Sequence, residues 1–324
     1  MTSMHDRDGW IWNNGNWLPW REATTHMLNH TLHYGMGCFE GVRAYQGATG
    51  THIFRLHDHT RRLIDSAHSL DMNLEWSIEA LNQVQCAAVV RNGLANAYIK
   101  PTVYFGSEGM GLRAQGLSTN IMIPAWDLGD YLSPEAARIG LSALTSSWSR
   151  HHVNISLCRA KTNGHYVNSM LALNTAVKAG FDETLMLDPE GYVAEASAAN
   201  VFLWRDGCLH TPEITSCLQG ITRDTVIELA RKVLKVEVRE RRITRDELYT
   251  ADEAFLTGTA AEILPLRRLD GRVIGNRSTG LSDPEQAIGD ATITAQLQRL
   301  YHRLVRGDLG EDLSSFSAWL TPVE

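Results

Sequence analysis

The stretch from Cys158 to Phe202 restricts the fold more than any other, because a lysine, a helical pattern and a β-hairpin pattern follow one another there, and a second hairpin pattern continues to His210. The spacing predicts a helix that begins soon after Lys161 and ends at Gly180. Its periodic positions are Tyr166, Val167, Met170, Leu171, Asn174 and Val177. Alternating residues then flank the turns Pro189-Glu190-Gly191 and Arg205-Asp206-Gly207, which predicts consecutive hairpins.

Lys161 is a candidate for covalent chemistry because lysine is scarce in this chain. The five lysines are Lys100, Lys161, Lys178, Lys232 and Lys235, and the last three fall on amphipathic helical patterns typical of solvated lysines. A lysine at a helix start lies near the positive end of the helix dipole, which disfavours its ammonium form. A neutral amine is what Schiff-base formation requires. A lysine placed at a helix start by chance is the alternative.

Glu195 is a second candidate, since it lies in a run of small residues that extends to Asn200, where nothing bulky shields it. A carboxylate in such a position can keep a nitrogen heterocycle protonated, which turns that ring into an electron sink.

Length and composition predict a two-domain protein that buries a large core, since 44% of the 324 residues are hydrophobic. We expect a small α/β domain at 1–125, an interdomain loop at 126–137 and a large cofactor-binding domain at 138–324. The net charge of −7 argues against nucleic acid or anionic membrane as the main partner. The polar start and the lack of a long apolar run favour a cytoplasmic protein. Five cysteines without CxxC spacing, and histidines without HExxH, predict neither disulfides nor a metal site.

The first 125 residues read as strands mixed with two helices. Trp10-Ile11-Trp12 and Trp17-Leu18 flank Asn14-Gly15, a strong hairpin signal. Residues 59–72 and 77–91 show helical spacing, while residues 97–105 and 120–124 read as strands. Gly35, Gly37 and Gly41 lie among aromatic residues and would let backbone approach a ligand, with a bulged core strand as the alternative.

Two later segments are candidate anion sites. Gly220-Ile221-Thr222 opens a helical pattern with Thr222 as its expected cap, and such a helix start offers N–H groups to a phosphate. The small and hydroxyl residues from Thr257 to Glu262 follow an apolar strand. Ordinary helix capping is the alternative for each. Thr244 and Glu247 predict a capping box, residues 269–273 a hairpin, and Ile288, Ile293, Leu297, Leu300, Tyr301 and Leu304 a terminal helix.

An amine, a carboxylate for a ring nitrogen and two phosphate cradles describe a site for pyridoxal 5′-phosphate. From about Trp10 onward, the chain resembles the branched-chain amino acid aminotransferases of the fold-type IV pyridoxal phosphate enzymes, which have a D-amino acid aminotransferase-like fold of mixed α+β and α/β character. The motifs that carry the resemblance are His33-Tyr34-Gly35, Phe39-Glu40-Gly41-Val42-Arg43, Phe54-Arg55 with His59 and Arg62-Leu63, Ala160-Lys161 with Tyr166, Glu195 with Asn200, Gly220-Ile221-Thr222-Arg223-Asp224 and Gly258-Thr259-Ala260-Ala261-Glu262.

The resemblance implies a ping-pong transamination from leucine, isoleucine or valine to a 2-oxo acid, with 2-oxoglutarate as the expected acceptor. It makes Lys161 the Schiff-base lysine and proton carrier, and it places Glu195 at the pyridine nitrogen and Tyr166 at the phenolic oxygen. Arg62, Ile221, Thr222 and Thr259 would hold the phosphate. The implied substrate residues are Phe39, Tyr98, Lys100, Thr259, Ala260 and, from a neighbouring subunit of a homodimer or larger homo-oligomer, Tyr34.

Three departures from the family pattern affect the expected pocket. Lys100 stands where an arginine usually binds the distal carboxylate of glutamate, and lysine lacks the bidentate fork. Ala196 and Ala198 replace glycines, and Leu128 replaces a tryptophan. The alternatives are a transaminase for D-amino acids or (R)-amines, an aminodeoxychorismate lyase, and a vitamin B6 binding protein without catalysis.

Overall fold

The computed structural model describes residues 3–129, 138–275 and 289–323. The chain divides into two compact units. The first unit consists of Met1–Gly129, Ala160–His165 and Val305–Glu324, and the second of Asp130–Arg159 and Tyr166–Leu304. These units are discontinuous in sequence, whereas the predicted domains at 1–125 and 138–324 are continuous. The two divisions are not equivalent, and the domain boundaries stay a prediction. Residues 130–137 of the predicted interdomain loop lie outside the described residues.

The first unit is built on a nine-stranded sheet with the order β18-β5-β4-β6-β8-β1-β2, in which β7 joins β3 to β8. Its strands are β1 (Trp10–Asn13), β2 (Asn16–Pro19), β3 (Gly37–Phe39), β4 (Val42–Gly47), β5 (Gly50–Phe54), β6 (Ala97–Ile99), β7 (Thr102–Phe105), β8 (Thr119–Trp126) and β18 (Leu320–Pro322). Its helices are η1 (Trp20–Glu22), α1 (His30–Tyr34), α2 (Leu56–Ser69), α3 (Ile78–Arg91), η2 (Asn163–His165) and η3 (Ser314–Trp319).

Local signals account for two features of this sheet. The predicted hairpin is confirmed: β1 pairs with β2, and both Asn14 and Gly15 have positive φ angles, 47° and 91°. The single strand predicted at 97–105 is wrong, because the chain forms two strands separated at Lys100 and Pro101. Proline has no N–H to donate to a ladder, so the pairing is interrupted there.

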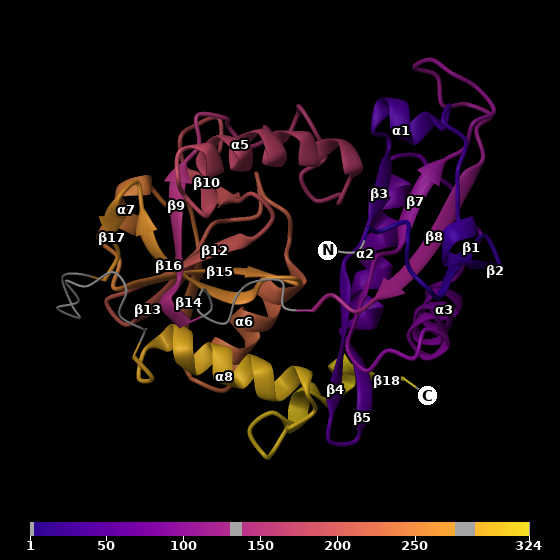
Figure 1. Cartoon of the computed structure of the whole chain (residues 1–324). Coiled ribbons are helices and arrows are strands. Elements are labelled where there is room, and N and C mark those ends of the chain that lie inside the picture. Colours follow the sequence, from indigo (N-terminus) through magenta and orange to yellow (C-terminus); the bar gives the residue numbers. More distant parts are fainter. Residues whose placement is uncertain (1–2, 130–137, 276–288, 324) are drawn as a thin grey trace. The chain divides into compact units, whose positions relative to one another are not determined.

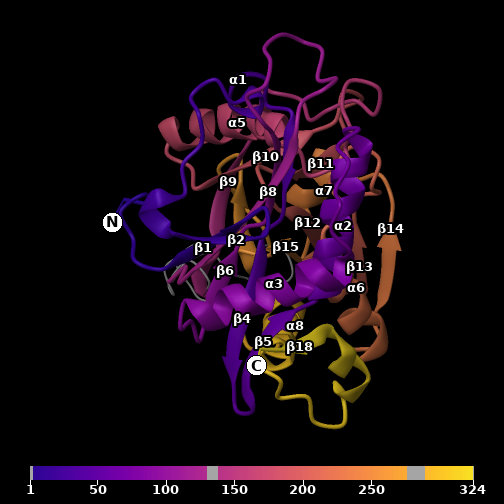
Figure 2. The ribbon, with the colours of Figure 1, turned by 90° about the vertical axis from the view of Figure 1, so that its right-hand side faces the viewer.

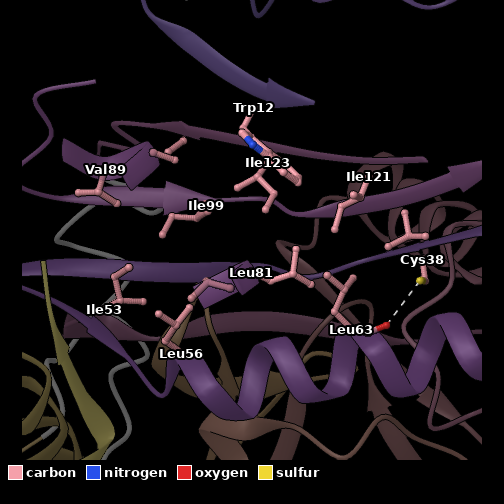
Figure 3. Close-up of a cluster of buried hydrophobic side chains, with 14 of the residues drawn as sticks. Trp12, Cys38, Ile53, Leu56, Leu63, Leu81, Val89, Ile99, Ile121 and Ile123 are labelled. Carbon is pink, nitrogen blue, oxygen red and sulfur yellow. Dashed lines mark hydrogen bonds between the residues drawn. The ribbon is translucent and has the colours of Figure 1, made fainter. Parts of the chain in front are cut away.

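A buried apolar cluster holds this unit together. Leu63 of α2 and Leu81 of α3 are fully buried in it together with Ile99, Ile121 and Ile123 of the strands. The two helices contact each other (Figure 2), and the leucines and isoleucines gather between helix and strands (Figure 3). The cluster thereby fixes α2 against the sheet.

The second unit contains another nine-stranded sheet, with the order β11-β10-β9-β16-β15-β12-β13-β14 and with β17 on β16. Strands β9, β10 and β12 to β17 can be found in Figure 1. Its strands are β9 (Leu141–Thr145), β10 (Glu183–Leu187), β11 (Val193–Ala196), β12 (Asn200–Arg205), β13 (Cys208–Thr211), β14 (Glu237–Glu240), β15 (Glu253–Gly258), β16 (Glu262–Leu269) and β17 (Arg272–Val273). Its helices are α5 (Tyr166–Lys178), α6 (Ile221–Lys232), α7 (Arg245–Tyr249) and α8 (Ile293–Val305), whose last residue groups with the first unit.

Most sequence predictions for this unit are confirmed. The hairpins β10–β11, β12–β13 and β16–β17 form, the capping box at Thr244 and Glu247 is present, and α8 is a helix. Ile288 of the predicted terminal helix lies outside the described residues. Thr222 is not the cap of α6, because Asp224 N–H donates to Gly220 C=O and the helix already begins at Ile221.

Helix α5 forms where expected, but it buries its small side chains. Ser169, Ala172 and Ala176 are buried, whereas Val167 and Met170 remain 61% and 60% exposed. The periodic apolar residues therefore lie on an exposed face of the helix rather than in the core of this unit.

No helix in the described part of the chain is long and apolar enough to cross a bilayer. Across residues 3–129, 138–275 and 289–323, no three His, Cys, Asp or Glu side chains are grouped as metal ligands would be.

Candidate active site

Within the first unit, the backbone of the segment that carries Lys161 is bound to β3 and to helix α2. Lys161 C=O accepts from Phe39 N–H at 3.0 Å, and Lys161 N–H donates to Ser66 Oγ at 3.1 Å. Thr162 forms a β-bridge with Cys38, so the segment continues the pairing of β3. The backbone of Lys161 is thus held by strand β3 through its C=O and by helix α2 through its N–H.

Two predicted site residues, Lys100 and Lys161, place their amines over the ring of a third, Phe39. Lys100 Nζ lies 4.8 Å from the ring centroid and Lys161 Nζ lies 5.2 Å from it. Burial and the nearby charge of Lys161 lower the pKa of Lys100. The aromatic face attracts both amines, and their proximity favours loss of charge from Lys100.

Tyr98 comes from the neighbouring strand β6, and its ring packs against Trp126 with centroids 5.2 Å apart. A Cβ atom on Gly41 would lie only 2.1 Å from the Tyr98 hydroxyl oxygen. Gly41, one of the glycines predicted to let backbone approach a ligand, therefore leaves the space that the Tyr98 hydroxyl occupies.

Arg62 is held by a carboxylate to which the sequence assigned no role. Arg62 Nε and Nη2 donate to the two oxygens of Glu40 at 2.6 and 2.9 Å, and His59 Nδ1 donates to Glu40 Oε2 at 2.7 Å. Burial alone would raise the pKa of the fully buried Glu40, but Arg62 and His59 lower it below its usual range. Burial lowers the pKa of His59, which keeps the imidazole neutral. The fork of Arg62 is consequently fixed in one orientation.

In the second unit, Glu195 on β11 is buried and paired with Arg150. Arg150 Nε donates to Glu195 Oε1 at 2.7 Å. Glu195 Oε2 accepts longer bonds, from Asn200 Nδ2 at 3.5 Å and Leu218 N–H at 3.4 Å. The expectation that nothing bulky shields Glu195 is wrong, because an arginine distant in sequence covers it. Arg150 was missed, since no local pattern connects it with Glu195.

The turn after Glu195 accepts alanine without strain, because neither Ala196 nor Ala198 has a positive φ angle. Glu183 stabilises this turn through two hydrogen bonds. Its carboxylate accepts from Ser197 N–H and Ser197 Oγ, at 3.3 and 3.0 Å. Burial raises the pKa of Glu183.

The start of α6 lies next to Asn200. Asn200 Nδ2 donates to Leu218 C=O at 2.9 Å, and a Cβ atom on Gly220 would lie 2.0 Å from Asn200 Oδ1. Gly220 is the N-cap and, being a glycine, supplies no side-chain hydrogen bond to the first turn of α6. The N–H groups of a helix start bind anions well.

The second predicted anion segment joins β15 to β16. Thr257 pairs with Asn200 in the ladder, is 1% exposed, and its Oγ1 lacks a hydrogen-bond partner within the described structure. Thr259 and Ala260 form the half-buried turn that follows. A buried hydroxyl without a partner costs free energy unless a ligand completes it.

The remaining predicted residues lie at helix ends. Tyr166 is the first residue of α5 and is half-buried. Tyr34 ends α1 and is 43% exposed, and its hydroxyl accepts from Gly111 N–H at 3.1 Å.

The sequence model of the Amino-transferase class IV family matches residues 37–269, a range that contains Lys161, Glu195 and both candidate anion segments. The chain belongs to the class IV aminotransferases. Among class IV relatives, the branched-chain-amino-acid aminotransferase of Pseudomonas aeruginosa is 54% identical over 94% of this chain and 95% of its own length. The enzyme of the same name from Escherichia coli K12 is 39% identical over 92% of this chain and 94% of its own.

The chain is also similar to solved structures of branched-chain amino acid aminotransferases. The T.th. branched-chain amino acid aminotransferase complexed with N-(5′-phosphopyridoxyl)-L-glutamate is 41% identical, with a TM-score of 0.89 and coverage of 98% of this chain and 99% of that one. The fold-type IV architecture predicted from the sequence is confirmed by this match.

Proposed function

We propose that this class IV aminotransferase uses pyridoxal 5′-phosphate to move the amino group of leucine, isoleucine or valine to a 2-oxo acid, with 2-oxoglutarate as the expected acceptor. Its substrates are small molecules. The observation that carries the proposal is the 54% identity, over 94% of the chain, to a branched-chain-amino-acid aminotransferase.

The residues of this chain fit the phosphate group of such a cofactor. Helix α6 begins at Ile221 after a glycine N-cap, and the buried Thr257 hydroxyl has no partner in the described structure. Ile221, Thr222 and Thr259 would bind the phosphate through backbone and hydroxyl groups. Arg62 would add a guanidinium whose Nε and Nη2 are oriented by Glu40.

Pyridoxal phosphate, when bound, draws electrons from the substrate α-carbon through its ring. The amine of Lys161 would hold the cofactor in its resting state and then carry the proton between the substrate Cα and the cofactor C4′. The carboxylate of Glu195 would retain the proton on the ring nitrogen, and the hydroxyl of Tyr166 would donate to the phenolic oxygen.

Phe39, Tyr98, Lys100, Thr259 and Ala260 would bind the substrate. The ring of Phe39 offers an apolar wall for a branched side chain, whereas the ammonium of Lys100 offers a charge for a distal carboxylate. Because a lysine makes no bidentate contact, we expect the dicarboxylate acceptor to be held by a single charged group.

We also propose that the protein is a homodimer or a larger homo-oligomer, in which Tyr34 reaches a neighbouring subunit. In support, the Tyr34 hydroxyl accepts from Gly111 N–H, and the neighbours of these two residues in the sequence include exposed apolar side chains, namely Met27, Leu28, Leu32, Met110 and Leu112. Exposed apolar patches are typical of interaction surfaces. Since the substrates are amino acids and oxo acids, we propose a cytoplasmic location.

A panel of half-reactions tests the proposal. The visible absorbance of the cofactor-loaded protein is followed after separate addition of L-leucine, L-glutamate, D-alanine or (R)-1-phenylethylamine. We expect bleaching by L-leucine and L-glutamate. A response to D-alanine or the amine alone would contradict the proposal, as would release of pyruvate from aminodeoxychorismate without a second oxo acid. Lys161→Ala is the control, because it should abolish the response.

A further inference from the structure

Arg150 connects two parts of the second unit that carry cofactor contacts in the proposed function. It lies in the loop after β9, is 8% exposed, and its N–H donates to Leu187 C=O at the end of β10. Its side chain makes three further bonds. Nε donates to Glu195 Oε1 at 2.7 Å, while Nη1 donates to Asn168 Oδ1 at 3.2 Å and Ser169 Oγ at 3.1 Å.

We propose that Arg150 is a positioning residue for transamination, which fixes the Glu195 carboxylate toward the ring nitrogen and in register with the start of α5. This inference rests on the proposed function. Arg150 itself touches neither substrate nor cofactor in it, and acts through Glu195 and the helix.

The charge of Arg150 is one reason for this role. Glu195 lies on a strand whose four residues are all buried, where a lone carboxylate would be costly. Arginine stays protonated in proteins, so it supplies a permanent counter-charge at Oε1. The pair keeps Glu195 as an acceptor for a ring N–H.

The fork of Arg150 is the second reason. Asn168 and Ser169 lie two and three residues after Tyr166, in the first turn of α5. The Arg150 guanidinium therefore connects Glu195, the predicted partner of the ring nitrogen, to helix α5. The first residue of that helix, Tyr166, is the predicted partner of the phenolic oxygen. A lysine, with its single nitrogen, cannot reproduce both sets of contacts.

The test compares Arg150→Gln and Arg150→Lys with a matched control, Arg241→Gln. The control removes an ion pair of the same unit, Arg241 with Glu247, that has no part in the proposed site. Each protein is loaded with pyridoxal phosphate labelled with ¹⁵N in the ring, and the ¹⁵N chemical shift reports whether the ring nitrogen is protonated. Glu195→Gln supplies the reference for a ring without its carboxylate partner. Circular dichroism checks folding, and equilibrium dialysis gives the cofactor dissociation constant.

We expect the ¹⁵N shift of Arg150→Gln to move toward that of Glu195→Gln, and the L-leucine half-reaction to slow by about 10- to 100-fold, the range found when a group that orients a metal ligand is removed. Arg150→Lys should restore the ¹⁵N shift more than the affinity for the cofactor, because it restores the charge without the fork. The control should match the wild type in all three measurements.

A folded Arg150→Gln with the wild-type ¹⁵N shift and half-reaction rate would overturn the inference. If Arg150→Gln does not fold, Ser169→Ala replaces it, since that change removes one bond of the fork and leaves the ion pair. It should weaken cofactor binding without changing the ¹⁵N shift, and unchanged binding would then overturn the inference. A wild-type protein that L-leucine does not bleach would instead refute the proposed function.

Discussion

Replacing Glu40 by glutamine should destabilise the protein strongly. Glutamine keeps the shape of the side chain, but it loses the charge and one of two acceptor oxygens. Its NH₂ group would then face N–H donors of Arg62 or His59, which donate to Glu40 at 2.6 to 2.9 Å. Removing one partner of a buried ion pair costs about 3–5 kcal/mol, because the other charge stays buried without compensation.

The assay is thermal unfolding of the cofactor-free protein, followed by circular dichroism. For domains of 150 to 250 residues, 1 kcal/mol corresponds to about 2–4 °C in Tm, so we expect a decrease of about 6–20 °C. The matched control is Glu190→Gln, which breaks the exposed pair of Glu190 with Arg242. Exposed pairs contribute at most about 1 kcal/mol, so the control should change Tm by only a few degrees.

The pH dependence gives an independent check on the same carboxylate. Because the pKa of Glu40 is lower in the folded than in the unfolded chain, its contribution to stability is complete above the unfolded pKa of about 4.3. It is lost as the pH falls toward the folded pKa. The difference between wild type and Glu40→Gln should therefore shrink below about pH 4. A Tm difference under about 3 °C at pH 7, or one that is equal at pH 3 and pH 7, would refute this reasoning.

Three further predictions follow from single contacts. Since burial lowers the pKa of Lys100, KM for 2-oxoglutarate should begin to rise below the ordinary lysine pKa of about 10.4, while KM for L-leucine stays constant, and Lys100→Arg should remove the rise; a flat wild-type profile would contradict this. Phe202→Ala should cost about 3–5 kcal/mol in urea unfolding, because Phe202 is fully buried and stacks on Phe255 with centroids 5.0 Å apart; a loss below about 1 kcal/mol would be too small for such a cavity. Gly41→Ala should displace the Tyr98 hydroxyl and raise KM for L-leucine, with little change in the far-ultraviolet circular dichroism; an unchanged KM would show that Tyr98 does not contact the substrate.

Local chemistry explains which parts of the fold the sequence predicts correctly. Asn14-Gly15 and Asp270-Gly271 occupy positive-φ positions between paired strands, so each hairpin is encoded by its own turn. The break at Pro101 was missed, because the alternation of apolar residues continues across it. The buried face of α5 was also hidden, since small side chains such as Ala172 give no apolar periodicity.

In the candidate site too, the sequence predicts some residues and misses others. Lys161 stands out in the sequence because lysine is scarce and a helical pattern follows it, and Glu195 stands out because it lies in a run of small residues. Their partners Ser66 and Arg150 do not, because they lie 95 and 45 residues away and no local pattern distinguishes them. Thr222 was interpreted as a cap from its residue type, whereas the actual helix start depends on backbone hydrogen bonds around Gly220.

The pairing of β18 with β5 affects how the protein is made. Thr321 pairs with Ile53, so this edge of the first sheet receives its last strand from residues synthesised more than 260 positions later. Until then β5 presents unpaired N–H and C=O groups, which attract other chains. We expect the nascent chain to depend on chaperones that shield this edge, although most of the strands in the same sheet have already left the ribosome.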